Sequence, residues 1–300
     1  MNHHRYKIGI DLGGTKTEVI LLDHADMVLH RRRTATPRQD GYAAILRSVA
    51  ALVSETIRKV PEGGGYTIGI GIPGSIDTAT GLVRNANTTC LIGEPLQQDI
   101  ENMLGTRVVV ENDANCFTLA ECRAGAGQGY GFVFGIIMGT GCGGGICING
   151  QVRRGSHGIA GEWGHCSVDP QGATCYCGNR GCVETKISGS GVSAAFLRTY
   201  GRRLSMEDIV QGCRRDDAQC REALDRFLDD FGRCLGGVIS VLDPDAVVLG
   251  GGLSNIDELY RLGVERVRRY AFHNNLQTPI LKNGLGDSAG VFGAAWIGAE

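Results

Sequence analysis

Residues 8–22 read IGIDLGGTKTEVILL, two β-type runs on either side of a Gly-Gly turn. Apolar residues alternate with small or polar ones as far as Leu12, and residues 17–22 are again β-branched or aliphatic. The stretch therefore predicts a strand, a tight turn and a second strand. The same order returns at residues 132–148, FVFGIIMGTGCGGGICI. This weak internal duplication predicts two related lobes.

Helical periodicity alternates with short apolar runs in the rest of the chain. The predicted helices run from Tyr42 to a stop before Pro61, near Pro95–Leu104, onward from Asp113, over about Asp217–Leu242 and over about Ile256–Tyr270; the further predicted strands are Thr67–Ile72, Arg107–Val110 and Val247–Leu249. This alternation favours an α/β fold with two lobes. We assign residues 1–115 with 288–300 to a small lobe and residues 116–287 to a large lobe.

Length and charge exclude several classes of protein. The 300 residues amount to about two typical domains. Lys and Arg total 30 against 32 Asp and Glu, so no strong attraction to nucleic acid or to an anionic membrane is expected. Residues 131–148 carry no charge, but seven glycines favour two buried strands over a membrane helix. Twelve cysteines behind the polar start Met1–Lys7 indicate reduced thiols and a cytoplasmic protein.

The first glycine turn has the composition of a phosphate-binding loop. Gly13 and Gly14 allow backbone N–H groups to approach phosphate oxygens, and Thr15 and Lys16 add side-chain donors. Asp11, at the end of the preceding strand, is suited to hold the water shell of a metal ion. A hairpin turn with no ligand is the alternative for this segment.

Two further glycine turns favour the functional interpretation. Gly139, Thr140 and Gly141 occupy the equivalent turn of the second lobe, and Gly251 and Gly252 follow a short apolar strand. Bare backbone at such a turn suits a flat adenine ring. None of the three turns has P-loop spacing or the G-x-G-x-x-G spacing of dinucleotide-binding folds. We therefore expect a nucleoside triphosphate between the lobes rather than three structural turns.

Asp113 is the candidate general base. It follows a predicted strand and opens a helix, and ligands bind at strand ends in open α/β sheets. Phosphoryl transfer to an alcohol needs a carboxylate that accepts the hydroxyl proton. Asp is also a favoured helix N-cap, so spacing alone gives the two roles equal weight.

A cysteine-rich segment predicts a structural zinc site. His165, Cys175, Cys177 and Cys182 fall within eighteen positions, and three thiolates with one imidazole form a closed tetrahedral set. Free thiols are the alternative. Glu162 and Glu184 flank this knuckle in the sequence, and Asn87 and Asn112 are amides of the kind that bind polyols. Each of these four could equally be a solvated surface residue.

Residues 11–16, 111–113, 161–165 and 175–184 together resemble the ROK family of repressors, open reading frames and kinases. The similarity runs in order from Ile8 to Trp296. Within the family the chain resembles the bacterial manno(fructo)kinases through residues 9–20 (GIDLGGTKTEVI), 71–75, 85–87, 175–177 and 286–288. The loop Cys166–Ala173 is shorter than in that group.

This resemblance implies a two-lobed, actin-like or hexokinase-type ATPase fold of the ribonuclease H-like class, with a cleft between the lobes. It implies MgATP as phosphoryl donor, structural Zn²⁺, a hexose as acceptor, with fructose first, and a homodimer. Asp113 would be the base for the 6-hydroxyl group of the sugar. The residues implied to bind sugar are Gly74, Asn87, Asn112, Glu162, His165 and Glu184; those implied to bind MgATP are Asp11, Gly13, Gly14, Thr15, Lys16, Gly139, Thr140, Gly141, Gly251 and Gly252.

Other acceptors and other functions stay open at this level. Glucose and N-acetylhexosamines are the alternative acceptors within the family. A nucleotide-switched binding protein of the actin or chaperone type would share the glycine turns but gives no reason for Glu162, His165 and Glu184 beside a zinc knuckle. A regulator that senses sugar without phosphorylating it is a third hypothesis. Only about seven residues precede the first strand, so no DNA-binding module and no nucleic-acid partner are expected.

Overall fold

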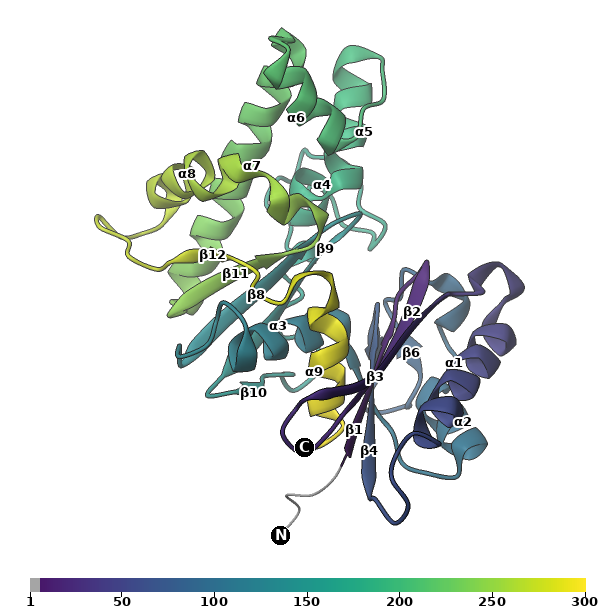
Figure 1. Cartoon of the computed structure of the whole chain (residues 1–300). Coiled ribbons are helices and arrows are strands. Elements are labelled where there is room, and N and C mark those ends of the chain that lie inside the picture. The colour runs from purple at the N-terminus through teal and green to yellow at the C-terminus, as the bar shows by residue number, and fades with distance from the viewer. Residues whose placement is uncertain (1–5) are drawn as a thin grey trace. The chain divides into compact units, whose positions relative to one another are not determined.

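The computed structural model describes residues 6–300 and divides them into two compact units (Figure 1). Unit 1 contains residues 6–120, Arg153–Ala160 and Asp287–Glu300, and unit 2 contains residues 121–152 and 161–286. The lobe boundaries given from sequence stay a prediction, and they leave Arg153–Ala160 outside the first lobe. Most of the polar start Met1–Lys7, on which the expected cytoplasmic location partly rests, lies outside the described residues.

Twelve strands, nine α-helices and six short 3-10 turns make up the described residues. The strands are β1 (Tyr6–Leu12), β2 (Lys16–Leu22), β3 (Val28–Ala35), β4 (Tyr66–Ile72), β5 (Ser75–Ile76), β6 (Val83–Arg84), β7 (Val109–Asn112), β8 (Phe132–Met138), β9 (Cys142–Ile148), β10 (Gln151–Val152), β11 (Ala246–Gly250) and β12 (Ile280–Lys282). The helices are α1 (Tyr42–Ile57), α2 (Leu96–Leu104), α3 (Asp113–Ala124), α4 (Val183–Ile187), α5 (Gly189–Tyr200), α6 (Met206–Arg214), α7 (Ala218–Leu242), α8 (Leu262–Tyr270) and α9 (Ala289–Ile297). The 3-10 turns are η1 (Arg38–Asp40), η2 (Thr89–Leu91), η3 (Trp163–His165), η4 (Gly252–Asn255), η5 (Asp257–Tyr260) and η6 (Gly286–Ser288).

The two main sheets have the same strand order. Unit 1 has β3-β2-β1-β4-β7 and unit 2 has β10-β9-β8-β11-β12. In each, an antiparallel hairpin, β1–β2 or β8–β9, is followed by two strands parallel to its first member. The predicted internal duplication is therefore confirmed at the level of topology. The uncharged stretch 131–148 is mainly the β8–β9 hairpin, and no helix among residues 6–300 is long and apolar enough to cross a membrane.

Glycine allows the C-terminal helix to lie directly on the backbone of the unit 1 sheet. Gly9 of β1 and Gly69 of β4 are paired in the parallel register. A side chain at Gly9 would collide with the carbonyl oxygen of Val291, and one at Gly69 with that of Ala294. Helix α9 therefore returns from the far end of the sequence to cover one face of this sheet, and α1 covers the other (Figure 1).

The remaining sequence-predicted elements match with two differences. The strand expected at Arg107–Val110 is β7, two residues later. The helix expected over Ile256–Tyr270 is divided into η5 and α8 at Arg261, whose φ of −117° and ψ of −77° depart from helical values. Strand β3 escaped sequence analysis because it is an exposed edge strand with no apolar alternation.

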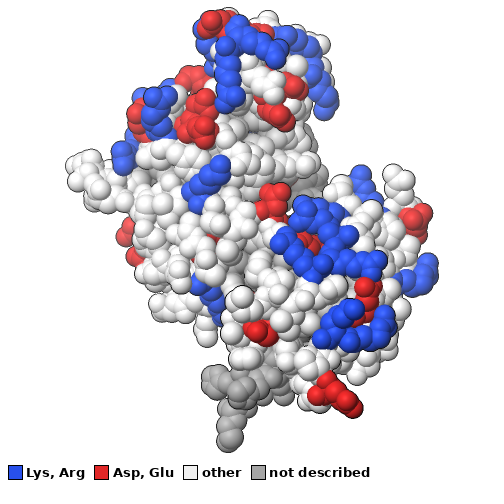
Figure 2. Space-filling model, viewed as in Figure 1, with Lys and Arg blue, Asp and Glu red and all other residues white. Residues whose placement is uncertain are grey.

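Charges of both signs are mixed on the face shown in Figure 2. Where Lys and Arg gather on unit 1, acidic partners accompany them: Arg31 and Arg33 of β3 both pair with the buried Glu18. A mixed surface of this kind favours a small ligand over a polyanion.

Candidate active site

The predicted site residues of unit 1 lie at the carboxyl ends of three parallel strands. The register pairs Asp11 of β1 with Gly71 of β4, and Gly71 with Glu111 of β7. The first glycine turn, the Gly74 segment and Asp113 follow these three strands, so they lie along one edge of the sheet. This is the edge at which open α/β sheets bind ligands.

A threonine that sequence analysis missed holds the first glycine turn. The N–H of Gly13 donates to the carbonyl of Lys16 at 3.0 Å and closes the turn. The Thr36 hydroxyl donates to the carbonyl of Gly13 at 2.7 Å, and the Thr36 N–H donates to the carbonyl of Thr15 at 3.0 Å. Thr36 follows the unrecognised edge strand β3, which explains why no sequence signal pointed to it.

Asp11 is a largely buried carboxyl group beside the start of α9. A Cβ at Gly290 would lie 3.2 Å from Asp11 Oδ2, so only glycine leaves the carboxylate this room. Burial, with the negative charge of Glu18, raises the pKa of Asp11 from 3.8 to about 6. A carboxylate held at this energetic cost is a candidate for cation binding.

Asn112 joins the predicted sugar-binding residues of unit 1. Its Nδ2 donates to the carbonyl of Gly74 at 3.1 Å, and the N–H of Asn87 donates to the adjacent Pro73 carbonyl at 3.3 Å. Gly74 has φ +153°, and a side chain there would meet the carbonyl of Arg84 at 2.7 Å. Gly74, Asn87 and Asn112 therefore form one cluster at the sheet edge.

The N-cap of α3 is Asn112, not Asp113. Asn112 Oδ1 accepts from the N–H groups of Ala114 at 2.9 Å and Asn115 at 3.2 Å. Asp113 is the first helical residue, and its Oδ1 accepts from Ala114 N–H at 2.8 Å. Since the capping role is filled, this observation favours the other role considered for Asp113.

The second glycine turn is fixed by two neighbouring segments within unit 2. The carbonyl of Gly139 accepts from Gly189 N–H at 2.8 Å, and that of Thr140 accepts from the Ser190 hydroxyl at 2.6 Å. The N–H of Cys142 donates to Glu184 Oε2 at 2.9 Å. Glu184 therefore ties this turn to the cysteine-rich segment, a connection that the sequence did not reveal.

A cavity of about 900 Å³ opens beside this turn in unit 2. Gly139, Thr140 and Gly252 line it, together with residues of α5 and α6 that sequence analysis did not single out. Gly251 has φ +78°, and a side chain there would collide with the Met138 carbonyl, so the two glycine turns meet backbone to backbone. The volume falls in the range of small-molecule sites.

The four predicted zinc ligands converge. The ligand atoms of His165, Cys175, Cys177 and Cys182 all lie within 4.8 Å of one another. Zinc–sulfur bonds of about 2.3 Å in a tetrahedron put neighbouring sulfur atoms about 3.8 Å apart. The Cys177 and Cys182 sulfurs are 3.6 Å apart, and Cys175 Sγ lies 3.7 Å from His165 Nδ1. The residues present therefore fit a tetrahedral zinc ion.

A tyrosine between two of these cysteines contacts the other nitrogen of His165. The Tyr176 hydroxyl lies 3.0 Å from His165 Nε2, the nitrogen that faces away from the thiols. Burial, with the negative charge of Glu184, raises the pKa of Tyr176 to about 12, so the hydroxyl keeps its proton. Burial likewise raises the pKa of Glu162, and the Glu184 carboxylate adds to the effect. Glu162, His165, Glu184 and Tyr176 form one polar cluster in unit 2.

The model of the ROK family matches residues 7–300. The chain is 37% identical to an N-acetyl-D-glucosamine kinase of Pectobacterium carotovorum over 299 residues, 96% of this chain and 97% of that protein. An N-acetyl-D-glucosamine kinase of Escherichia coli is 36% identical, over 96% of this chain and 98% of that protein.

Solved structures give the same result. The ROK hexokinase of Thermus thermophilus has a TM-score of 0.88 and 30% identity over 98% of each chain. A ROK family glucokinase of Streptomyces griseus, in complex with glucose and AMPPNP, has a TM-score of 0.80 and 31% identity over 98% of this chain and 99% of that one. The expected α/β fold of the actin-like, hexokinase type is confirmed. None of these two kinases and two solved structures is named for fructose, so the expected preference for fructose gains no support.

Proposed function

We propose that this chain, a sugar kinase that belongs to the ROK family, transfers the γ-phosphoryl group of ATP to the 6-hydroxyl group of N-acetyl-D-glucosamine. The observation that carries the proposal is local: Asn112 caps α3 and leaves Asp113 at the strand edge that also holds Gly74 and Asn87. The acceptor is supported by the relatives of 36–37% identity that bear this name.

Asp113 acts as general base in this proposal. Its carboxylate accepts the proton of the 6-hydroxyl group while that oxygen attacks the γ-phosphorus, and the bond from phosphorus to the β–γ bridging oxygen breaks. The products are ADP and the sugar 6-phosphate. Mg²⁺ would neutralise charge on the phosphates, and Asp11 would hold its water shell.

The remaining predicted residues position the two substrates. Backbone N–H groups at Gly14, Thr140 and Gly141, with the side chains of Thr15, Thr140 and Lys16, donate to the phosphates. The N–H groups of Gly13 and Gly139 close the two turns on the carbonyls of Lys16 and Gly141. Gly251 and Gly252 contact adenine. The residues proposed to bind the sugar hydroxyls are Asn87, Asn112, the backbone at Gly74, Glu162, His165 and Glu184. Zn²⁺ held by His165, Cys175, Cys177 and Cys182 would fix the orientation of the His165 ring.

Fructose is the second candidate acceptor. Residues 9–20 and the Cys175-Tyr176-Cys177 step resemble the manno(fructo)kinases, and Tyr176 lies directly on the nitrogen of His165 that would face the sugar. A hydroxyl partner at this nitrogen leaves less room for a bulky substituent. The acceptor panel below therefore compares the two sugars directly. We further propose that the protein acts in the cytoplasm and as a homodimer.

The test is an ADP-release assay over N-acetyl-D-glucosamine, glucose, mannose, N-acetylmannosamine and fructose. We expect the highest kcat/KM with N-acetyl-D-glucosamine. Asp113→Asn should lower kcat by about 10²–10⁴-fold while calorimetry shows that sugar still binds. Asp40→Asn, at an exposed site of the same unit, is the matched control. ADP release that is indifferent to every sugar would instead support the nucleotide-switched binding protein.

A further inference from the structure

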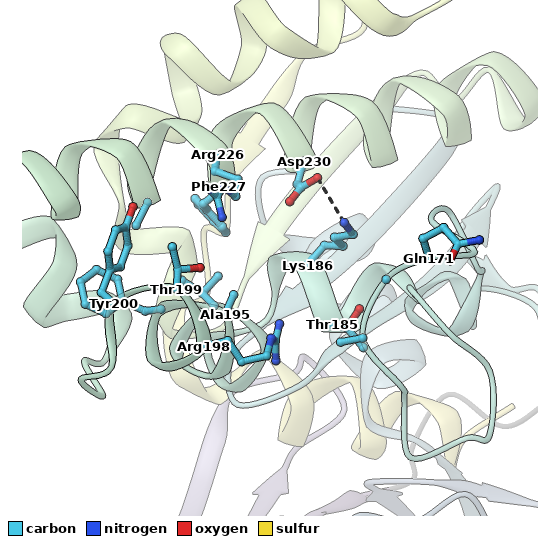
Figure 3. A pocket seen from close by; sticks show the side chains of 15 residues that line it. Gln171, Thr185, Lys186, Ala195, Arg198, Thr199, Tyr200, Arg226, Phe227 and Asp230 are labelled. Atoms are coloured by element: carbon cyan, nitrogen blue, oxygen red, sulfur yellow. Dashed lines mark ion pairs between the residues drawn. The ribbon is translucent and has the colours of Figure 1, made fainter.

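Unit 2 contains another cavity, of about 320 Å³, which Thr185 and Lys186 of α4 line. The loop 171–173, α4, α5 and α7 surround it (Figure 3). None of the residues proposed above for ATP, sugar or zinc lines it. The cavity therefore has no role in the proposed reaction.

The charge of the lining residues is unbalanced. Lys186 of α4, Arg198 of α5 and Arg226 of α7 contribute three positive charges, and Asp230 contributes one negative charge. Figure 3 shows these side chains around one space; Lys186 comes from α4, Arg198 from α5, and Arg226 and Asp230 from α7. Asp169 and Glu222, which do not line the cavity, pair with Lys186 and Arg226, so the charge of Arg198 is the one left to attract an anion.

The three cations differ in the partners that they already have. Lys186 Nζ lies 2.6 Å from Asp169 Oδ2 and 4.0 Å from Asp230 Oδ1, and Arg226 pairs with Glu222 at 3.0 Å. Arg198 makes no ion pair or hydrogen bond with any residue in the part of the chain that the structure describes. Its guanidinium group is therefore the one most available to bind an anion.

The other lining groups suit an organic body that carries hydroxyl groups. Val192, Phe196 and Phe227 form an apolar wall, and Thr185, Thr199 and Gln171 supply donors and acceptors. The Tyr200 hydroxyl is buried without a hydrogen-bond partner among residues 6–300. A bare anion would contact only the cations, whereas a phosphorylated polyol would contact the cations through its phosphate and the hydroxyl, amide and apolar groups through its body.

The cavity adjoins the segments that hold the proposed sugar residues. Thr185 and Lys186 directly follow Glu184, and the loop 171–173 leads into Cys175. The Lys186–Asp169 ion pair connects α4 to that loop. A phosphate that competes with Asp169 for Lys186 loosens this connection and so changes the placement of Glu184.

We propose that this cavity is a regulatory site for a sugar phosphate, a phosphomonoester on a polyhydroxylated body of hexose size. The identity of the sugar rests on the proposed function, which makes N-acetyl-D-glucosamine 6-phosphate the product and therefore the first probe. Arg198 and Lys186 bind the phosphate, and the threonine and tyrosine hydroxyls bind the sugar. Occupancy lowers kcat, because the displaced Glu184 no longer holds the second glycine turn through the N–H of Cys142.

Calorimetry on the full, zinc-loaded chain tests the site. The protein is saturated with N-acetyl-D-glucosamine and a non-hydrolysable ATP analogue, so that the reaction site is filled, and is then titrated with N-acetyl-D-glucosamine 6-phosphate or with inorganic phosphate. We expect one equivalent of the sugar phosphate to bind. Arg198→Glu should weaken binding at least tenfold, and Arg226→Ala several-fold. Arg203→Glu, an exposed change of the same charge, should leave binding unchanged.

A kinetic arm links the site to activity. Inhibition by the sugar phosphate should persist at saturating acceptor in the wild type and in Arg203→Glu, and should be lost in Arg198→Glu, whose basal kcat is unchanged. Three outcomes would overturn the proposal. The first is equal binding of the sugar phosphate by Arg198→Glu and Arg203→Glu, and the second is binding that disappears when the reaction site is filled. The third is an affinity for inorganic phosphate equal to that for the sugar phosphate. A chain without kinase activity that still shows Arg198-dependent binding refutes the proposed function and leaves the binding site standing.

Discussion

At the scale of single residues, the role proposed for Asp11 conflicts with stability. The carboxyl group is largely buried beside Glu18, and burial raises its pKa from 3.8 to about 6. The proposed role at Mg²⁺ requires the ionised form. The fold therefore carries an unfavourable charge whose benefit appears only when a cation is bound.

The pH dependence of stability tests this view of Asp11. Because the pKa of Asp11 is raised in the folded state, ionisation of this group destabilises the folded protein. The free energy of unfolding therefore decreases as pH rises from 3.8 to about 6. Above pH 6 the full loss, about 3 kcal/mol at most, is present. Asp11→Asn should therefore raise the Tm of the ligand-free protein at pH 8 and leave it nearly unchanged at pH 4. Asp40→Asn is the control. An equal gain at both pH values would contradict the assignment.

The same shift predicts how activity responds to acid. In the wild type, kcat/KM for MgATP should fall as pH decreases through about 6, because protonated Asp11 no longer attracts the hydrated cation. Asp11→Asn should be strongly impaired at every pH. A wild-type profile that is flat from pH 7 to pH 5 would contradict a role for this carboxylate at the metal.

At the scale of secondary-structure elements, the start of α3 determines where the proposed base lies. Glu111 accepts from the side chain of Asn115 at 2.9 Å and also binds Arg154, while Asn112 caps the helix and reaches the Gly74 carbonyl. The strand end, the helix start and the Gly74 loop are therefore fixed together. Asp113 lies at the point where all three meet.

Two substitutions of Asn112 separate capping from positioning. Asn112→Ala removes the cap and should lower the free energy of unfolding by about 1–2 kcal/mol and kcat by about tenfold or more. Asn112→Asp keeps the cap acceptor but loses the donor to Gly74, so it should retain most of the stability and still lose activity. Denaturant titration and the ADP-release assay measure both quantities. Equal destabilisation by the two variants would show that capping is not the cause.

At the scale of the whole molecule, unit 1 is assembled from segments that are distant in the sequence, and contacts within unit 2 join residues far apart in the chain. Unit 1 takes in Arg153–Ala160 and Asp287–Glu300, and α9 covers the β1–β4 face where Gly9 and Gly69 leave room. In unit 2 the cysteine knuckle is bound to the second glycine turn through Glu184. The proposed zinc ion therefore supports a connection that extends beyond its own loop.

Removal of zinc should affect both stability and substrate binding. Metal analysis should find about one zinc per chain, and a strong chelator should lower the Tm and raise the KM for sugar more than the KM for ATP. Cys177→Ser should reproduce both effects. Cys213→Ser, at a partly buried cysteine of the same unit outside the cluster, is the control. An unchanged Tm after complete removal of the metal would show that the fold does not need it.

Features that depend on neighbouring residues could be predicted from the sequence. The repeated strand–glycine–strand pattern predicted both hairpins, and ligand spacing predicted the cysteine knuckle. Helical periodicity predicted α7 almost to the residue and the start of α1, whose end lies a few residues earlier than expected. Local backbone preference and the short reach of a cysteine side chain leave few alternatives in such segments. The family resemblance added the fold, which the solved structures confirm.

Contacts between distant segments had to be read from the folded chain. These contacts placed Arg153–Ala160 in unit 1, made Asn112 rather than Asp113 the helix cap, set Tyr176 on His165, and brought Arg198, Lys186 and Arg226 around one cavity. The preference for fructose was inferred from short motifs, and it gained no support. Acceptor choice depends on which side chains the fold brings together around the sugar, and short motifs do not record this. Periodicity records which face of an element is buried, but the partner on that face is selected by packing across the whole chain.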